Sequence, residues 1–438
     1  MGNIATLAEI TSLITDGKHG DCVDEFDSGY YFISSKDVRD GKINYEDARQ
    51  ITKVDFEDTH RRTRLEPDDI LITNSGTIGR MAIVREGEKT RRTTFQKSVA
   101  IIKPKKHLAE PRFLYYTFLT QVGYLVELSG GTAQKNLLLG DLRRFKVRVP
   151  TIGVQKKIAA ILSAYDDLIE NNQRRIALLE KMAEETYREW FVRLRFPGHD
   201  KVKALKGVTE GWKVKQFHEI VEYYIGGGWG EDDQSTTFSE AAFVIRGTDI
   251  PDIQAGEFEG CPYRFHKPSN LKSRMLQPGD FVFEVSGGSK DQLLGRNVFV
   301  TERLLKYFNA PVVAASFCKQ IRFSRELVSP YFMKYFMKLY YDYDLVGIYQ
   351  IQSTGISNYQ FESFLKYQTI VLPPDELQKK FEDMVKPIIE MRDDISLANI
   401  ELRKTRDLLL PRLISGKLSV ENLDIQFPPS MAEVAHAA

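Results

Sequence analysis

The chain has 438 residues, which exceeds the usual size of one domain and predicts two globular units with connecting elements. Its 61 basic and 60 acidic residues leave a formal net charge of +1, so a nucleic-acid surface would have to be a local basic patch. Three distant cysteines exclude a disulfide framework and a structural zinc site, and no apolar stretch approaches the roughly 20 residues that span a bilayer. We therefore expect a cytoplasmic protein without membrane segments.

The sequence contains one ordered series of residues twice, which predicts an internal duplication. Glu9-Ile10 recurs as Glu219-Ile220, 210 residues later (219 − 9), and Gln155-Lys156-Lys157 recurs as Gln378-Lys379-Lys380, 223 residues later (378 − 155). The separation only increases along the chain, as small insertions in the second copy would cause. The intermediate matches pair Gly17 with Gly227, Pro67 with Pro278, Ser75-Gly76 with Ser286-Gly287, Gly79-Arg80 with Gly295-Arg296, Pro111 with Pro330 and Asn136 with Asn358.

Each copy begins with short apolar runs bounded by turn residues, which is typical of strands. Residues 69–73 and 281–285 are the clearest of these predicted strands. One helix is predicted in each copy, near residues 111–126 and 330–345. We therefore expect a mixed, β-rich domain over residues 1–150 and a second one over residues 197–374.

A helical period follows each predicted domain, over residues 151–196 and 375–416. Apolar residues recur there every seventh position, as in the seam of a coiled coil, and the first helix would be about 60 Å long, more than a small domain can cover. The first seam comprises Leu162, Ile169, Ile176, Ala183 and Trp190 with Tyr165, Asn172, Leu179 and Thr186; the second comprises Ile388, Ile395, Leu402 and Leu409 with Met391 and Ala398 beside them.

The predicted fold class is therefore α+β, a tandem duplication of a β-rich mixed domain followed by a long helix. Copies related by a pseudo-twofold axis place the entrance of each helix beside the exit of the other, so we expect an antiparallel coiled coil that acts as a spacer. Residues 417–438 form a C-terminal tail.

No motif of a known active site is present. The chain lacks the phosphate-binding loop, HExxH, GxSxG and Asp-Pro-Pro-Tyr patterns. The Gly226-Gly-Gly-Trp-Gly230 run has no following helix or acidic partner, so a turn is favoured over a cofactor loop. Asp280, Glu284 and Lys290 could form a nuclease triad, but their first-copy counterparts fit strand ends better.

Polar, glycine-containing loops are the remaining candidates, because their side chains can contact base edges or phosphates. Examples are Asn74-Ser-Gly-Thr-Ile-Gly-Arg80, its longer counterpart over residues 286–296, and the pair over residues 131–136 and 352–358. An ordinary hairpin or a helix N-cap is the alternative for each loop. The candidate DNA-binding residues are Lys18, His19, Asn74, Ser75, Thr77, Arg80, Gln134, Lys135, Asn136, Gly228, Trp229, Ser286, Ser289, Lys290, Gln292, Arg296, Gln352, Ser353 and Asn358.

Several segments resemble the specificity subunits of type I restriction-modification systems. Glu185-Thr-Tyr-Arg-Glu-Trp-Phe-Val-Arg-Leu-Arg-Phe-Pro-Gly-His199 and Leu408-Leu-Leu-Pro-Arg-Leu-Ile-Ser-Gly-Lys-Leu418 are similar to the ends of that family's two long helices. The helix entrances at 149–157 and 372–380 and the loop at 74–79 are similar as well. The resemblance covers the chain to about Leu418.

This resemblance implies a subunit without an active site that carries two target-recognition domains, each reading one half of a split target in double-stranded DNA. It implies two methyltransferase subunits as partners, bound to the helices, and restriction/translocase subunits for cleavage. S-adenosylmethionine would belong to the methylase, which methylates adenine at N6, and ATP and Mg to the ATP-dependent endonuclease. Two alternatives remain open: a two-domain scaffold for proteins only, and a fused restriction-methylation enzyme with an unrecognised site.

Comparison of the two copies sorts the candidates. Residues that both copies share cannot explain two different half-sites, so they should shape the fold or hold phosphate. These are Ser75 with Ser286, Gly76 with Gly287, Arg80 with Arg296 and Asn136 with Asn358. The candidates for base reading are the positions that differ: Lys18 and His19 against Gly228 and Trp229, Asn74 and Thr77 against Val285 and the 290–292 insertion, and Gln134 and Lys135 against Ile356 and Ser357.

Overall fold

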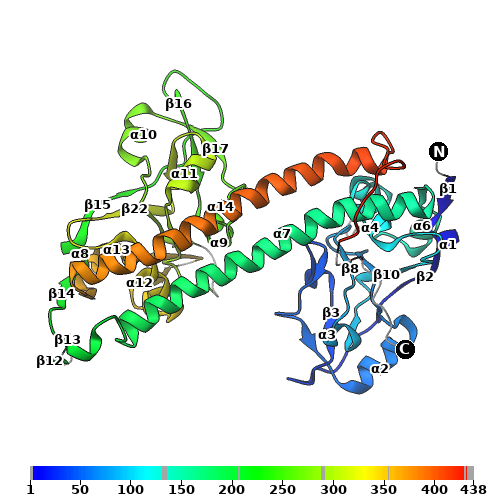
Figure 1. Ribbon diagram of the computed structural model, residues 1–438, viewed down its shortest axis with the longest axis horizontal. Coiled ribbons are helices and arrows are strands. Elements are labelled where there is room, and N and C mark those ends of the chain that lie inside the picture. The colour runs from blue at the N-terminus through cyan, green and yellow to red at the C-terminus, as the bar shows by residue number, and fades with distance from the viewer. Residues whose placement is uncertain are drawn as a thin grey trace. The chain divides into compact units, whose positions relative to one another are not determined.

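The computed structural model describes residues 3–130, 136–202, 204–205, 208–287, 292–353, 355–428 and 431, and Figure 1 shows its elements. The chain divides into two compact units. The first unit joins residues 1–168 to residues 402–438, and the second unit comprises residues 169–401. Each unit contains one β-rich domain, called here the first or the second domain, and part of each of two long helices, α7 (Ile152–Tyr187) and α14 (Asp375–Ile414).

The first domain is built around two sheets and also contains the two-stranded sheets β1-β11 and β4-β5. One is antiparallel in the order β2-β10-β7-β8, and the other has the order β6-β3-β9 with β3 and β9 parallel. The strands are β1 (Asn3–Thr6), β2 (Thr11–Asp16), β3 (Tyr31–Ile33), β4 (Val38–Arg39), β5 (Lys42–Ile43), β6 (Arg49–Gln50), β7 (Ile70–Thr73), β8 (Met81–Ile83), β9 (Thr93–Phe95), β10 (Val99–Pro104) and β11 (Lys146–Val149). The helices are α1 (Leu7–Ile10), α2 (Lys53–Thr63), α3 (Glu88–Arg91), α4 (Pro111–Leu119), α5 (Val122–Leu128) and α6 (Leu139–Arg144), with a 3-10 turn at Ser35–Asp37.

The second domain repeats this topology, with sheets ordered β15-β22-β18-β20 and β17-β16-β21, and adds the sheet β19-β24-β23. Its strands are β12 (Ala204–Leu205), β13 (Val208–Thr209), β14 (Lys213–Gln216), β15 (Val221–Gly226), β16 (Glu240–Ile245), β17 (Tyr263–His266), β18 (Phe281–Glu284), β19 (Ser286–Gly287), β20 (Asn297–Phe299), β21 (Val312–Ala314), β22 (Cys318–Phe323), β23 (Gln350–Ser353), β24 (Ile356–Tyr359) and β25 (Thr369–Leu372). Its helices are α8 (Phe217–Ile220), α9 (Ile250–Gln254), α10 (Pro268–Arg274), α11 (Glu302–Phe308), α12 (Pro330–Asp342) and α13 (Phe361–Tyr367).

Two glycines show why the copies keep the same backbone. A Cβ on Gly17 would lie 1.9 Å from the carbonyl oxygen of Phe95, and one on Gly227 would lie 2.1 Å from that of Ala315. In both domains the chain leaves its sheet at this glycine and passes directly against the end of a neighbouring strand. Any larger residue would force the strands apart, which confirms the predicted duplication at the level of atomic contacts.

Two buried glutamines join each domain to the start of a long helix. Gln155 accepts a hydrogen bond from the backbone NH of Glu110 at 2.9 Å, and Gln378 accepts one from that of Ser329 at 2.9 Å. Each amide also donates to the carbonyl of the proline that precedes its helix, Pro150 or Pro373. The recurring Gln-Lys-Lys sequence therefore contains a structural amide, since a buried polar group must be fully hydrogen-bonded.

The two long helices pair antiparallel. In the second unit Asn172 Nδ2 donates to Asn399 Oδ1 at 2.8 Å, and the Arg392 guanidinium lies 3.3 Å from a Glu180 oxygen. Later residues of α7 therefore contact earlier residues of α14, as in an antiparallel pair. In the first unit Arg406 donates to Asp166 at 2.6 Å. The expected seam residues at seven-residue intervals are all buried, from Leu162 to Ala183 on α7 and at Trp190 in the π-helical turn Arg188–Val192 that follows it.

Two details of the predicted helices were wrong. The helix expected near residues 111–126 is broken into α4 and α5 at Thr120 and Gln121. On α14, Met391 and Ala398 are exposed rather than beside the seam. The buried positions there include Asp393, Ser396 and Asn399, polar residues that a search for hydrophobic periodicity passes over.

The described part of the C-terminal tail packs in the first unit. Val420 is buried, and Lys157 on α7 donates to the carbonyl oxygens of Glu421 and Leu423 at 2.7 Å each. Residues 417–428 therefore complete the hydrophobic core that α4 and the first turns of α7 share.

Candidate functional site

In the first domain, backbone hydrogen bonds hold four loop segments together. The NH of Lys97 donates to the carbonyl of Lys18 at 3.0 Å, the NH of Asn74 to that of Ser98 at 3.0 Å, and the NH of Leu137 to that of Asn74 at 2.8 Å. We call this surface, residues 17–19, 74–80, 96–98 and 136, the first loop face. It brings together most of the candidates that the sequence suggested in this domain.

The second domain builds the same arrangement. The NH of Gly228 donates to the carbonyl of Ala314 at 2.9 Å, that of Val285 to Phe317 at 2.9 Å, and that of Tyr359 to Val285 at 2.9 Å. We call residues 227–230, 285–287, 292–296, 315–317 and 356–358 the second loop face. Each of its segments corresponds to a segment of the first loop face.

The residues that both copies share take part in the fold of the loops. Ser286 pairs with Asn358 between β19 and β24, and its hydroxyl donates to Asn358 Oδ1 at 3.0 Å. Ser75 and Asn136 form the corresponding bridge in the first domain. Gln352, exposed on β23, pairs with Ser357 of the same small sheet.

The remaining first-domain candidates differ in how accessible they are. Lys18 donates to Asp55 at 2.7 Å and lies 3.4 Å from Asp58, and the bond to Asp55 raises its pKa. His19 is exposed beside Asp16, at 2.9 Å. Asn74 is buried, and its side-chain oxygen has no partner among the described residues. Thr77 is exposed, and its carbonyl accepts from the Thr73 hydroxyl.

The two equivalent arginines have different environments. Arg80 is exposed, and its guanidinium makes no hydrogen bond or ion pair with any residue that the structure describes. Arg296 donates twice to Glu284, at 2.6 and 2.8 Å, and only 14% of its side chain is exposed. In the amide orientation that satisfies both groups, Gln292 also accepts from Arg296, at 2.8 Å. Arg80 is therefore available to a ligand, whereas Arg296 is held within its domain.

Some candidates lie outside the described residues: Gln134, Lys135, Ser289, Lys290 and the side chain of Ser353. The sequence patterns did not indicate one segment of each face, Lys97-Ser98 in the first domain and Ser316-Phe317 in the second. Both precede the equivalent strands β10 and β22, so extending the alignment of the copies at an offset of 219 residues would have found them.

The second loop face surrounds a recess of about 960 Å³. Its described lining is mostly apolar and includes Trp229, Leu294, Phe317 and Ile356, together with the Glu284–Arg296 pair. Trp229 lies over the guanidinium of Arg264, 4.3 Å from ring centroid to Cζ, and its carbonyl accepts from Arg264 Nε at 2.7 Å.

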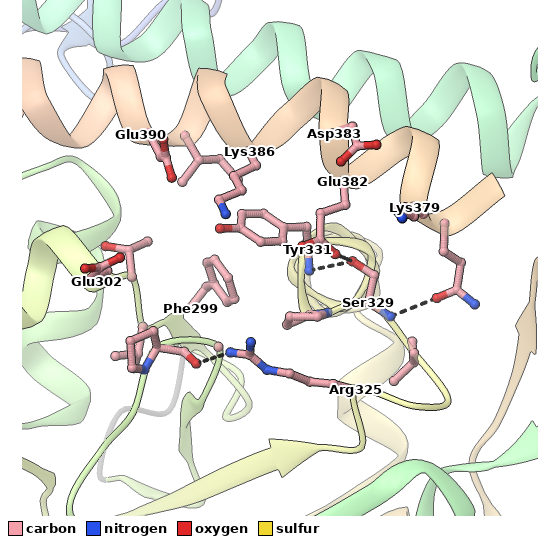
Figure 2. Close-up of a pocket in the computed structure, with 18 of the residues that line it drawn as sticks. Phe299, Glu302, Arg325, Ser329, Tyr331, Lys379, Glu382, Asp383, Lys386 and Glu390 are labelled. Carbon is pink, nitrogen blue, oxygen red and sulfur yellow. Dashed lines mark hydrogen bonds between the residues drawn. The ribbon is translucent and has the colours of Figure 1, made fainter. Parts of the chain in front are cut away.

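A second hollow of about 530 Å³ lies in the second unit between α12 and α14 (Figure 2). Its described lining includes seven carboxylates and four cationic side chains, so it would repel a phosphate backbone. Figure 2 shows Lys386 pointing into it, and Ser329 donates there to Glu382 at 2.7 Å. Burial, with Glu382 nearby, raises the pKa of Tyr331 to about 12, so this hydroxyl stays protonated at neutral pH.

Neither hollow contains the residues of a metal centre, because no group of three or more His, Cys, Asp or Glu side chains in the described ranges could hold a metal ion. Among the helices that the structure describes, none is long and apolar enough to cross a bilayer.

Comparison with known proteins agrees with this geometry. The family model described as "Type I restriction modification DNA specificity domain" matches residues 14–181. The MjaIX specificity subunit of a type I restriction enzyme from Methanocaldococcus jannaschii is 26% identical over 367 residues, which cover 81% of this chain and 78% of that protein. Over residues 14–181 and over most of its length the chain is therefore similar to type I restriction specificity subunits.

Two further relatives of this chain add detail. The EcoBI specificity subunit of Escherichia coli is 33% identical over 153 residues, 34% of this chain and 31% of that protein. The crystal structure of the S subunit of a type I system from M. genitalium superposes with a TM-score of 0.55 at 14% identity, covering 94% of this chain and 96% of that one. This likeness shows the shared fold.

Proposed function

We propose that this chain is a type I specificity subunit that reads a bipartite, asymmetric target in double-stranded DNA, with each loop face contacting one half of the target. The observation that carries the proposal is that two loop faces with the same backbone hydrogen bonds present different side chains. A duplicated backbone places both faces on the same kind of ligand, and the different side chains let them read different bases.

The chain's own role in this proposal is recognition without catalysis. Its methyltransferase partners would bind S-adenosylmethionine and methylate one adenine in each half-site, and its restriction partners would use ATP and Mg²⁺. Two buried residues at the loop faces fit such a role, since the Asn74 backbone holds Ser98 and Leu137 in place and the Glu284 carboxylate holds Arg296.

The test is methylation and binding by the chain assembled with its methylase subunits. We expect methylated adenines at one split sequence, and binding that weakens steeply as salt rises, because phosphate contacts release counterions. Replacing residues 20–145 by the same region of another specificity subunit should change one half-site and leave the other intact. Binding that ignores salt and sequence would favour the scaffold for proteins, and methylation by the chain alone would favour the fused enzyme.

The methylase subunits are proposed to bind the long helices. On α14, Met384 and Met391 are exposed seven residues apart, near the second hollow described above. On α7, Leu178 and Met182 are exposed four residues apart. Exposed apolar residues in such rows are typical of protein contacts, and methionine adapts its shape to a partner. The double variant Met384→Glu, Met391→Glu should lose co-purification with the methylase, whereas Val214→Glu, at an exposed position on β14, should retain it.

A further inference from the structure

The second loop face exposes apolar side chains at positions where the first loop face is polar. Trp229 corresponds to His19, and Phe317 to Ser98, the residue that precedes the equivalent strand. Trp229 is 41% exposed, Phe317 62% and Ile356 48%. Such residues would ordinarily be buried, and three of them around one recess are not the scattered single exposures common on protein surfaces.

A cation supports the side chain of Trp229, and hydrogen bonds position the backbone of Phe317. Arg264 covers one face of the Trp229 ring and also donates to the Trp229 carbonyl, so the ring is supported from one side. The carbonyl of Phe317 accepts from the NH of Val285 at 2.9 Å and from that of Ser286 at 3.2 Å, which ties it to the reading loop. An anchored apolar surface suits a specific contact, because little further ordering is needed when a ligand binds.

The charge beside this surface is already neutralised. Glu284 and Arg296 pair with each other at the recess, and Arg264 also pairs with Asp232. Polar side chains such as Gln292 and Ser286 remain in the lining, but aromatic groups occupy the positions of His19 and Ser98. In the major groove the only apolar group that bases offer is the C5 methyl of thymine.

We propose that the second domain recognises thymine methyl groups in its half of the target, through Trp229, Phe317 and Ile356. The inference rests on the proposed function, because the duplication places the second loop face on DNA as it places the first. It specifies that function further: the second half-site contains A·T pairs read by apolar contact, and the first half-site is read without such contacts at the equivalent positions.

The experiment uses the full complex with its methylase subunits and duplexes of the mapped target. Each thymine of the second half-site is replaced in turn by deoxyuridine, which removes the methyl group and leaves every base-pairing atom. We expect about fourfold weaker binding at one or more positions, the effect of about one buried methyl group. The same replacements in the first half-site serve as the control and should leave binding unchanged.

Variants then assign the effect to the recess. In Trp229→Ala and Phe317→Ala the ratio of the dissociation constants for the deoxyuridine and thymine duplexes should fall toward one. Val214→Ala, at an exposed apolar residue outside the recess, should keep the wild-type ratio. A second half-site without A·T pairs, or equal binding of all deoxyuridine duplexes, would overturn the inference while leaving specific DNA reading intact. Absence of any sequence-specific binding would instead overturn the proposed function.

Discussion

Thr73 and Glu284 end the same strand in the two domains, and the difference between them changes what the neighbouring arginine can do. In both domains the residue at the strand end donates its NH to the arginine carbonyl, at 2.9 Å in each case. Thr73 uses its hydroxyl to accept from the Arg80 backbone, whereas Glu284 binds the Arg296 guanidinium. The two domains therefore share the backbone of a reading loop, while the side chain at the strand end decides whether the arginine is exposed or paired.

The largest expected effect of this difference is on stability. Glu284→Ala leaves a mostly buried guanidinium without its partner, which should cost about 3 to 5 kcal/mol of unfolding free energy in the second unit. Thr73→Ala removes hydrogen bonds of an uncharged hydroxyl and should cost about 1 kcal/mol. All three tryptophans lie in the second unit, so urea unfolding followed by tryptophan fluorescence measures the loss in Glu284→Ala, and hydrogen exchange of peptides that cover β7 measures the loss in Thr73→Ala. Equal, small losses in both variants would remove the distinction between the two strand ends.

The starts of the same strands differ as well. Asp69 lies 2.6 Å from Lys103, and Asp280 accepts two bonds from Arg322, at 2.7 and 2.8 Å. Burial outweighs the lysine and raises the pKa of Asp69 to about 6. Because the folded state then holds this proton more tightly than the unfolded state, its contribution to stability is fully present below about pH 4 and is lost as pH rises through about 6.

We therefore expect the first unit to lose about 3 kcal/mol of opening free energy between pH 4 and pH 7 through this one carboxyl. In Asp69→Asn that slope should flatten. Hydrogen exchange of peptides that cover β7 and β10, with wild type and variant compared at the same pH, measures it. An unchanged slope in the variant would show that the pH dependence of the first unit arises elsewhere.

A smaller effect separates the two arginines in DNA binding. Arg80→Ala should weaken binding to all sequences by about tenfold, because an exposed guanidinium can hold a phosphate. It should also lower the salt slope, which is the steepness of the logarithm of the binding constant against the logarithm of the salt concentration, by about one. Arg296→Ala should leave the salt slope unchanged, since that cation is already paired with Glu284. Titrations at several salt concentrations, with full-length complexes checked for folding, measure both. Equal slopes for the two variants would mean that Arg296 leaves Glu284 when DNA binds.

The sequence predicted the architecture because duplication and helical periodicity are linear signals. The ordered matches from Glu9-Ile10 to Gln155 located both domains, and the seven-residue spacing located both long helices. It could not predict which polar residues of α14 are buried, because Asp393 and Asn399 are buried against partners distant in sequence, Thr301 and Asn172. It also treated Arg80 and Arg296 alike, since the partner of Arg296 lies twelve residues earlier and becomes adjacent only across two strands.

The smallest expected difference concerns two lysines of the first loop face. Lys18 was a candidate reader in the sequence, and its ammonium is bound to Asp55 and Asp58. Lys97 lies beside it, exposed, and no ion pair of Lys97 is found within the described ranges. A cation already paired on the protein releases few counterions from DNA, so Lys18→Ala should change affinity less than about twofold and leave the salt slope intact.

Lys97→Ala should lower the salt slope by about one, as Arg80→Ala does. Fluorescence anisotropy of the mapped target, titrated at three salt concentrations with both variants, measures the pair. A lower salt slope for Lys18→Ala alone would mean that the lysine exchanges Asp55 for a phosphate when DNA binds. The sequence prediction of Lys18 as a DNA-binding residue would then be right, and the expectation from its ion pairs would be wrong.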